Sequence, residues 1–175
     1  LFTNVKPNAV ISMPDVDSIY KIPIELNYQR VDEIVLEKFK LNSSKKPNLR
    51  DWRKVIKEDL EPKEFVKISM VGKYTELADA YKSLNEALKH GGFKNNLKVD
   101  IDYVDSEKLD SKNVHRKLGK SDAILVPGGF GERGIEGMVT AVKYARTKLI
   151  PYLGICLGMQ IAVIEFARNV ARLKL

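Results

Sequence analysis

The feature that most constrains this chain is a cysteine flanked by two glycines, Gly154-Ile155-Cys156-Leu157-Gly158. A short apolar run precedes it from residue 150, and an apolar segment without turn residues follows from 159 to 171. A strand, one tight turn and a helix, with a nucleophile at the turn, form a nucleophile elbow. The spacing therefore predicts an elbow with Cys156 at its apex.

The residue types at this turn suit chemistry at the cysteine. Side chains at positions 154 and 158 would collide with the strained backbone or the crossing helix, so glycines fit there. A cysteine at a helix N-terminus is placed where the helix dipole favours the thiolate, which is the nucleophilic form. A lone cysteine in an apolar run is more often a buried small side chain. The glycine pair at this boundary favours the catalytic interpretation.

Charge and cysteine content narrow the function classes. One cysteine permits no internal disulfide, which fits a reducing compartment and predicts a cytoplasmic protein. The apolar runs are too short for a signal peptide or membrane span. The net charge of +7 comes from thinly spread basic residues with a modest cluster at 45–57. Without an aromatic RNA-binding signature, we expect anionic small molecules such as nucleotides as partners, and no nucleic-acid polymer or membrane.

Strand and helix patterns alternate over the second part of the chain. The predicted strands are 65–71, 97–104, 123–126 and the elbow strand, and the predicted helices are 77–90, 112–118, 135–148 and 159–171. Gly91-Gly92 is expected to stop the first of these helices. Such alternation predicts an α/β fold, a three-layer, doubly wound and mostly parallel sheet, with ligands at the carboxyl ends of the strands.

The chain begins mid-pattern at Leu1 and is expected to be a piece of a longer protein. Its first block, 1–41, carries too little apolar surface for a domain and is interpreted as the tail of one. Within that block, 24–39 fits one helix or two short ones. The polar, basic stretch 42–64 is predicted to be an interdomain linker with a short helix at 49–60. The domain of interest is then 65–175.

A second glycine motif, Pro127-Gly128-Gly129-Phe130-Gly131, comes directly after the strand predicted at 123–126. Gly-Gly alone is most often a tight loop. The fold, however, places this loop and the elbow at the same sheet edge, where its backbone N–H groups can donate to a developing oxyanion. The N–H of Leu157, one residue past the nucleophile, is the second expected donor.

These two motifs together resemble the class I, triad-type glutamine amidotransferases, whose fold is flavodoxin-like. Three longer phrases narrow the resemblance to the CTP synthase family: ISMPDVDSIYKIP at 11–23, MVGKYTELADAYKS at 70–83 and LKHGG at 88–92. The resemblance implies an enzyme with two domains. One hydrolyses glutamine, and the ammonia passes to a synthetase domain that phosphorylates UTP with Mg-ATP and forms CTP. The family is activated by GTP and assembles as homotetramers.

The resemblance also implies roles for individual residues. Cys156 would form the glutamyl thioester, and seven residues would bind glutamine or its oxyanion: Gly128, Gly129, Phe130, Leu157, Gly158, Met159 and Gln160. Phe2, Asp15 and Val16 match the edge of the family's nucleotide site, and Lys82, Arg133 and Glu136 its GTP lid. No metal ligands are expected in this chain, because the magnesium and most of the ATP and UTP sites would lie in the missing synthetase part.

One departure from the family is serious. The mechanism needs a histidine oriented by a carboxylate, and in the family both lie downstream of the cysteine, beyond Leu175. His90 and His115 do not match the catalytic position. The fold is therefore expected to be incomplete at its C-terminus, and the chain alone inactive. Two alternatives stay open, namely another amidotransferase or elbow-cysteine hydrolase, and a non-catalytic flavodoxin-like interaction domain.

Overall fold

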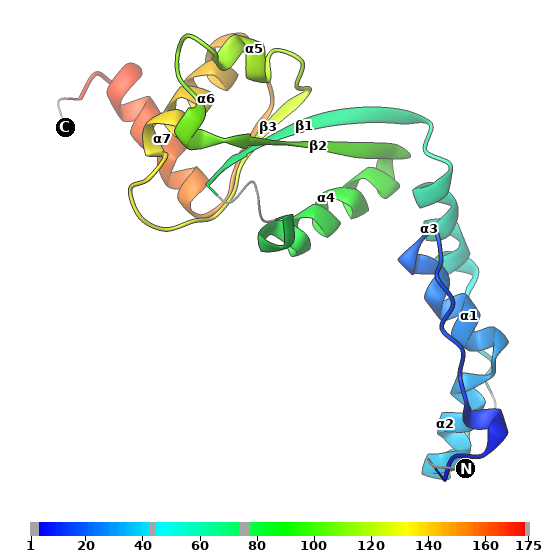
Figure 1. Cartoon of the computed structure of the whole chain (residues 1–175). Helices are drawn as coiled ribbons and strands as arrows, with labels where there is room; N and C mark the ends of the chain where they lie inside the picture. Colours follow the sequence, from blue (N-terminus) through cyan, green and yellow to red (C-terminus); the bar gives the residue numbers. More distant parts are fainter. Residues whose placement is uncertain (1–3, 43–44, 74–77, 174–175) are drawn as a thin grey trace. The chain divides into compact units, whose positions relative to one another are not determined.

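The computed structural model describes residues 4–42, 45–73 and 78–173 (Figure 1). The chain divides into two compact units, 1–63 and 64–175. The predicted nucleotide-site residue Phe2 lies outside the described residues. The predicted linker 42–64 falls almost wholly within the first unit, where residues 50–60 form a helix.

The first unit is helical. Its elements are the 3-10 turns η1 (Pro7–Ala9) and η2 (Ile19–Lys21) and the helices α1 (Ile22–Tyr28), α2 (Val31–Phe39) and α3 (Arg50–Leu60). Arg30 adopts a left-handed backbone conformation with φ 57°, which separates α1 from α2. α3 is tied to η2 because the Ser18 hydroxyl donates to Asp59 at 2.6 Å and the Trp52 indole N–H donates to the Tyr20 carbonyl.

The second unit is built on a parallel sheet. Among the described residues four strands pair in the order β2-β1-β3-β4. They are β1 (Glu64–Gly72), β2 (Leu97–Asp105), β3 (Ala123–Val126) and β4 (Tyr152–Gly154). The chain runs from β1 outward to β2, then crosses back past β1 to β3 and β4. The strand order therefore reverses between β1 and β3, and ligands bind at the carboxyl edge of such reversals.

Helices cover both faces of this sheet (Figure 1). α4 (Lys82–Asn95), preceded by η3 (Ala78–Tyr81), packs on one face, over a core that includes Met70 and Leu125. The other face carries η4 (Ser106–Lys108), α5 (Val114–Leu118), α6 (Ile135–Lys148) and α7 (Leu157–Asn169) over a larger core. Adjacent residues of β3, Leu125 and Val126, enter opposite cores, as the two-residue period of a strand requires. The predicted flavodoxin-like α/β fold is confirmed.

The expected stop at Gly91-Gly92 is wrong. α4 continues through both glycines to Asn95, and Asn96 ends it in a left-handed conformation with φ 56°. Gly92 is small for a different reason, because a β-carbon there would lie 2.6 Å from the carbonyl oxygen of Leu97 at the start of β2. The glycine thus permits close packing of helix and strand, while asparagine, which tolerates this conformation, supplies the stop.

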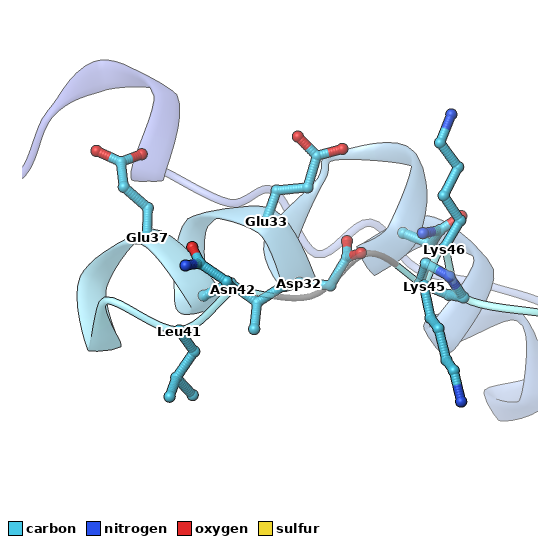
Figure 2. A pocket seen from close by; sticks show the side chains of 10 residues that line it. Asp32, Glu33, Glu37, Leu41, Asn42, Lys45 and Lys46 are labelled. Atoms are coloured by element: carbon cyan, nitrogen blue, oxygen red, sulfur yellow. The ribbon is translucent and has the colours of Figure 1, made fainter.

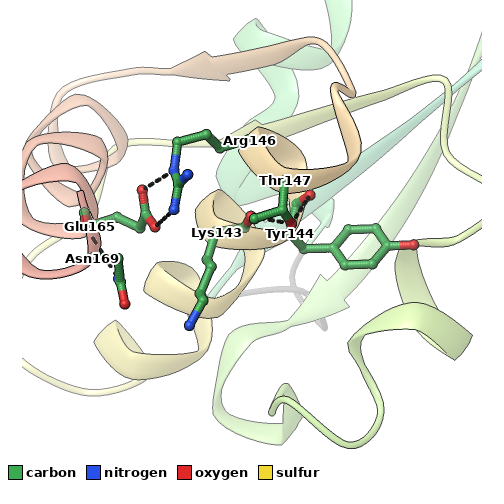
Figure 3. A network of polar contacts seen from close by, with 6 residues as sticks. All are labelled: Lys143, Tyr144, Arg146, Thr147, Glu165 and Asn169. Carbon is green, nitrogen blue, oxygen red and sulfur yellow. Dashed lines mark hydrogen bonds and ion pairs between the residues drawn. The ribbon is translucent and has the colours of Figure 1, made fainter.

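α6 and α7 are joined by an ion pair whose carboxylate is buried (Figure 3). Two guanidinium nitrogens of Arg146 donate to the two carboxylate oxygens of Glu165 at 2.9 and 2.8 Å. The Glu165 side chain is 1% exposed, whereas that of Arg146 is 38% exposed. Asn169 in turn donates to the Glu165 carbonyl. The pair fixes the helix that follows the predicted nucleophile against its neighbour.

Candidate active site

Cys156 occupies the turn between β4 and α7. Its backbone has φ 51° and ψ −104°, outside the regions that L-residues favour, and α7 begins at the next residue. Such strain persists only where the surroundings enforce it and is concentrated at functional sites. The thiol side chain is exposed. The predicted elbow is present, although the helix starts at Leu157, two residues earlier than expected.

Both flanking glycines are required by close backbone contacts. A β-carbon at Gly154 would lie 2.5 Å from the carbonyl carbon of Gly158, and one at Gly158 would lie 2.0 Å from the carbonyl oxygen of Val126. No side chain can occupy either position without moving backbone atoms. The steric reason given for this glycine pair therefore holds, and the crossing partner at position 158 is the end of β3.

Hydrogen bonds hold the elbow on β3 and on its own helix. The Ile155 N–H donates to the Val126 carbonyl at 3.0 Å, and the Gly158 N–H donates to the Ile155 carbonyl at 2.9 Å. The Tyr152 hydroxyl donates to the Gly158 carbonyl at 2.8 Å. Burial raises the pKa of Tyr152 to about 12, so the phenol keeps its proton and stays a donor at neutral pH. The sequence interpretation did not single out Tyr152.

The glycine loop lies directly against the elbow. A β-carbon at Gly128 would be 3.6 Å from the β-carbon of Cys156, and one at Gly129 would be 3.3 Å from a methyl group of Leu157. The two motifs, which are 25 to 30 residues apart in sequence, are thus in contact at the carboxyl edge of β3 and β4. The arrangement leaves room for main-chain approach to a ligand beside an exposed thiol. An oxyanion hole needs N–H donors at such a place, next to the nucleophile.

Comparison with known proteins identifies a family and a solved structure that resemble this chain. The family model for glutamine amidotransferase class-I matches residues 76–175. The chain belongs to the class-I glutamine amidotransferases. Among solved structures it is similar to the glutaminase domain of Trypanosoma brucei CTPS with bound acivicin, at 44% sequence identity and a TM-score of 0.56. That match covers 60% of this chain and 41% of the other, so the chain spans less than half of that domain's length. The expected resemblance to CTP synthases is confirmed.

The residues predicted to bind glutamine differ in exposure within this amidotransferase. Gly128, Phe130, Met159 and Gln160 are exposed, Gly129 is half-buried, and Leu157 and Gly158 are buried. The Leu157 side chain belongs to the core beneath α6 and α7, so only its backbone N–H is suited to the predicted role. The Phe130 ring is 88% exposed at the loop tip. The roles of these residues stay predictions.

The segment after the glycine loop is held by charged side chains. Arg133 pairs with Glu107 of η4 at 2.8 Å, and Glu136 pairs with Arg168 of α7 at 2.9 Å. Arg133 and Glu136 were predicted to form a GTP lid, together with Lys82, which is exposed at the start of α4. The structure shows two of these residues engaged with neighbouring elements, and their role toward GTP stays a prediction.

A buried lysine completes the support of the loop and was missed from the sequence. Lys73 directly follows β1, and its ammonium group donates to the carbonyl oxygens of Phe130, at 2.7 Å, and Gly131. The residue is 8% exposed. Burial lowers the pKa of Lys73, the positive charge of Arg133 lowers it further, and Glu107 acts in the opposite direction. A lysine at the carboxyl end of a predicted central strand was the available signal.

Both histidines of the amidotransferase are engaged with aromatic side chains. His115 of α5 shares a 2.9 Å hydrogen bond between its Nδ1 and the hydroxyl of Tyr144 on α6. The ring of His90 contacts Phe93 on the same helix, with centroids 5.8 Å apart. These are structural contacts, in keeping with the assignment made from the sequence. They identify no base for the elbow cysteine.

The first unit contains a polar pocket of about 840 Å³. It is lined by the acidic side chains Asp32, Glu33 and Glu37 of α2 and by Lys45 and Lys46 (Figure 2). Neither Asp15 nor Val16, the two predicted nucleotide-site residues that the structure describes, lines this pocket. Among the described residues no three His, Cys, Asp or Glu side chains are arranged so that they could hold a metal ion. No helix in the described part of the chain is long and apolar enough to cross a membrane.

Proposed function

We propose that the second unit binds glutamine and that Cys156 attacks the carbon of its side-chain carboxamide. The observation that carries this proposal is the contact between the glycine loop and the elbow, which puts the main chain of the loop beside an exposed cysteine with a strained backbone. Membership of the amidotransferase family supplies the substrate class. The N–H groups of Gly129 and Leu157 are the proposed oxyanion donors. Removing one such donor costs about 2.7–4 kcal/mol of barrier in a well-studied protease.

The first half-reaction needs one proton for the leaving group. The thiolate sulfur bonds to the carboxamide carbon, whose carbonyl oxygen becomes the oxyanion. The oxyanion then collapses, the carbon–nitrogen bond breaks, and nitrogen leaves as ammonia after accepting a proton. The product is a glutamyl thioester on Cys156, and water later cleaves it to glutamate. A histidine normally moves these protons.

We further propose that the 175-residue chain by itself does not turn over glutamine. No contact joins Cys156 to His90 or His115 among the described residues, since His90 contacts Phe93 and His115 bonds to Tyr144, so the proposal uses neither as the base. Substrate binding and capture of a reactive analogue need only the thiol and the loop. The chain is therefore expected to react once with an electrophilic glutamine analogue without catalysing hydrolysis.

For the parent enzyme we propose the CTP synthase reaction, ATP-dependent amination of UTP with ammonia from glutamine. The identity to the CTPS glutaminase domain supports it, as do the phrases at 11–23 and 70–83. Magnesium and ATP are part of this proposal through the resemblance to the CTP synthase family, which uses Mg-ATP in its synthetase domain. GTP activation, a homotetramer and a cytoplasmic location belong to the same proposal.

Labelling by acivicin tests the site directly. Its chloro-dihydroisoxazole ring resembles the glutamine side chain and loses chloride to an attacking thiolate. We expect intact-mass analysis to show one adduct on the purified chain, slowed by excess glutamine and abolished in Cys156→Ala. Iodoacetamide, which needs no binding site, serves as the control for thiol access. Equal behaviour of acivicin and iodoacetamide, with no glutamine protection, would refute a glutamine site.

Two other functions make different predictions. An interaction domain without catalysis predicts a thiol that acivicin leaves unmodified. The exposure of Cys156 and its strained backbone favour a catalytic origin over this possibility. A different amidotransferase predicts the same acivicin labelling but no CTP formation. Assay of the full-length parent with UTP, ATP and glutamine distinguishes that case, because only a CTP synthase then forms CTP.

A further inference from the structure

The ammonium group of Lys73 is the one buried cation that the described structure aims at the glycine loop. The side chain leaves the end of β1 and reaches the carbonyl oxygens of Phe130 and Gly131, two and three residues beyond Gly128. The Lys73 residue is 8% exposed. The Lys73 side chain therefore connects the end of β1 to the loop that follows the neighbouring strand β3.

Packing alone does not explain a charged group in this position. Burying an ammonium is unfavourable unless hydrogen bonds and nearby negative charge offset the loss of water. The positive charge of Arg133 adds to this cost, and Glu107, which is paired with Arg133, offsets only part of it. A leucine or methionine would fill a similar volume without this cost. The hydrogen bonds to the loop are what the lysine supplies and an apolar residue does not.

These hydrogen bonds fix the orientation of two peptide planes. Because the Phe130 and Gly131 carbonyls face the end of β1, the N–H groups of the same peptides face the opposite way. Pairing of Val126 with β4 holds the other end of the loop. Gly128 and Gly129, between these two anchors, are then presented to Cys156 and Leu157 at the observed close distances.

We propose that Lys73 is a positioning residue, whose ammonium group holds the glycine loop in the conformation that receives the glutamine carboxamide at Cys156. The inference rests on the proposed glutamine site and deepens it. Lys73 does not touch the reacting atoms. It acts through the peptides of Phe130 and Gly131, so its loss should affect substrate-directed chemistry more than the intrinsic reactivity of the thiol.

The test compares Lys73→Met, which keeps volume but not charge, with Lys73→Arg, which keeps the charge. Lys120→Met removes an exposed lysine and is the matched control. For each variant the acivicin labelling rate is divided by the iodoacetamide rate. We expect Lys73→Met to lower this ratio about tenfold to a hundredfold, as small misplacements of a reactive group do. Lys73→Arg should restore most of it, and Lys120→Met should leave it unchanged. An unchanged ratio in Lys73→Met overturns the proposal.

Two further readouts separate positioning from general stability. Amide hydrogen exchange over 128–132 should be faster in Lys73→Met than in the unmutated chain, whether or not acivicin reacts. Unchanged exchange overturns the inference even if the glutamine site fails its own test.

The pH dependence of labelling is the second readout. In the unmutated chain the ratio of acivicin to iodoacetamide labelling should fall at alkaline pH as Lys73 loses its proton, since the pKa of Lys73 is lowered. That fall should be absent in Lys73→Arg, which stays charged, and its persistence there would contradict the assignment.

Discussion

Gly158 approaches Val126 so closely that a β-carbon at position 158 would lie 2.0 Å from the Val126 carbonyl oxygen. Gly158→Ala therefore forces α7 away from β3. We expect it to lower the free energy of unfolding by about 3 kcal/mol, at the upper end of the usual cost of overpacking. Chemical denaturation measures this. The control is Gly91→Ala in α4, where nothing lies within 4 Å, and a gain of about 0.5–1 kcal/mol is expected. Equal effects of the two changes on stability would contradict the close approach of α7 to β3 at Gly158.

Gly128→Ala should separate folding from substrate binding. Its β-carbon would meet the β-carbon of Cys156 at 3.6 Å, an ordinary contact, so the fold should be retained. The added methyl group would occupy the approach to the thiol and the loop. We expect acivicin labelling to slow by about tenfold or more, the scale of small misplacements at reacting centres, with iodoacetamide labelling within a fewfold. Full acivicin reactivity would show that the loop does not border the substrate.

Tyr152→Phe removes the hydrogen bond to the Gly158 carbonyl and should cost about 1 kcal/mol of stability. The raised pKa of about 12 adds a pH signature. The folded state keeps this phenol protonated where the unfolded state, with a pKa near 10, loses the proton. The contribution is therefore complete below about pH 10 and is lost as the pH rises through 12. Phenolate absorbance should show one tyrosine titrating near pH 12, absent in Tyr152→Phe. A titration near pH 10 for Tyr152 would contradict its burial.

Arg146→Ala leaves the buried Glu165 carboxylate without its partner. Removing one partner of an ion pair is destabilising when the charge left behind is buried, as the Glu165 carboxylate is at 1% exposure, so Arg146→Ala should lower stability clearly. Arg168→Ala breaks the exposed pair with Glu136 and should cost less than about 1 kcal/mol. Thermal and urea unfolding compare them. The double change Arg146→Met with Glu165→Leu should recover much of the loss. A similar loss of stability for the two single changes would mean that burial of the Glu165 carboxylate does not raise the cost of breaking its ion pair.

The outer face of α7 is apolar and should drive self-association. Met159, Val163, Phe166 and Val170 are 42–65% exposed at helical spacing, and patches of this kind are typical of interaction surfaces. Val163→Glu with Phe166→Glu should reduce the mass measured by light scattering toward 19.8 kDa. Tyr28→Glu with Phe39→Glu, which replaces exposed aromatics of the first unit, should not. An unmutated chain that is already monomeric at high concentration would contradict the prediction.

Local patterns predicted the parts of the site that depend on neighbours in sequence. The elbow follows from two glycines around Cys156, and its meeting with Gly128 follows from the rule that parallel strands end at one edge. Lys73 could not be recognised, because nothing in its own sequence neighbourhood says which carbonyls its side chain will reach. The end of α4 was misplaced for a related reason. The need for glycine at position 92 comes from Leu97 on β2, a tertiary contact that a helix-end rule does not include.

β3 carries both halves of the site. The glycine loop is its direct continuation, and the nucleophile turn is attached to its last residue through Val126 and the Ile155 N–H. Twisting or sliding of this strand moves both halves as one body. The spacing between thiol and loop is therefore set by β3 together with the Lys73 hydrogen bonds that tie the loop to the end of β1. Deformations that move β2 alone should leave the reactive geometry intact, whereas opening the β3–β4 pairing or parting β1 from β3 should disturb it.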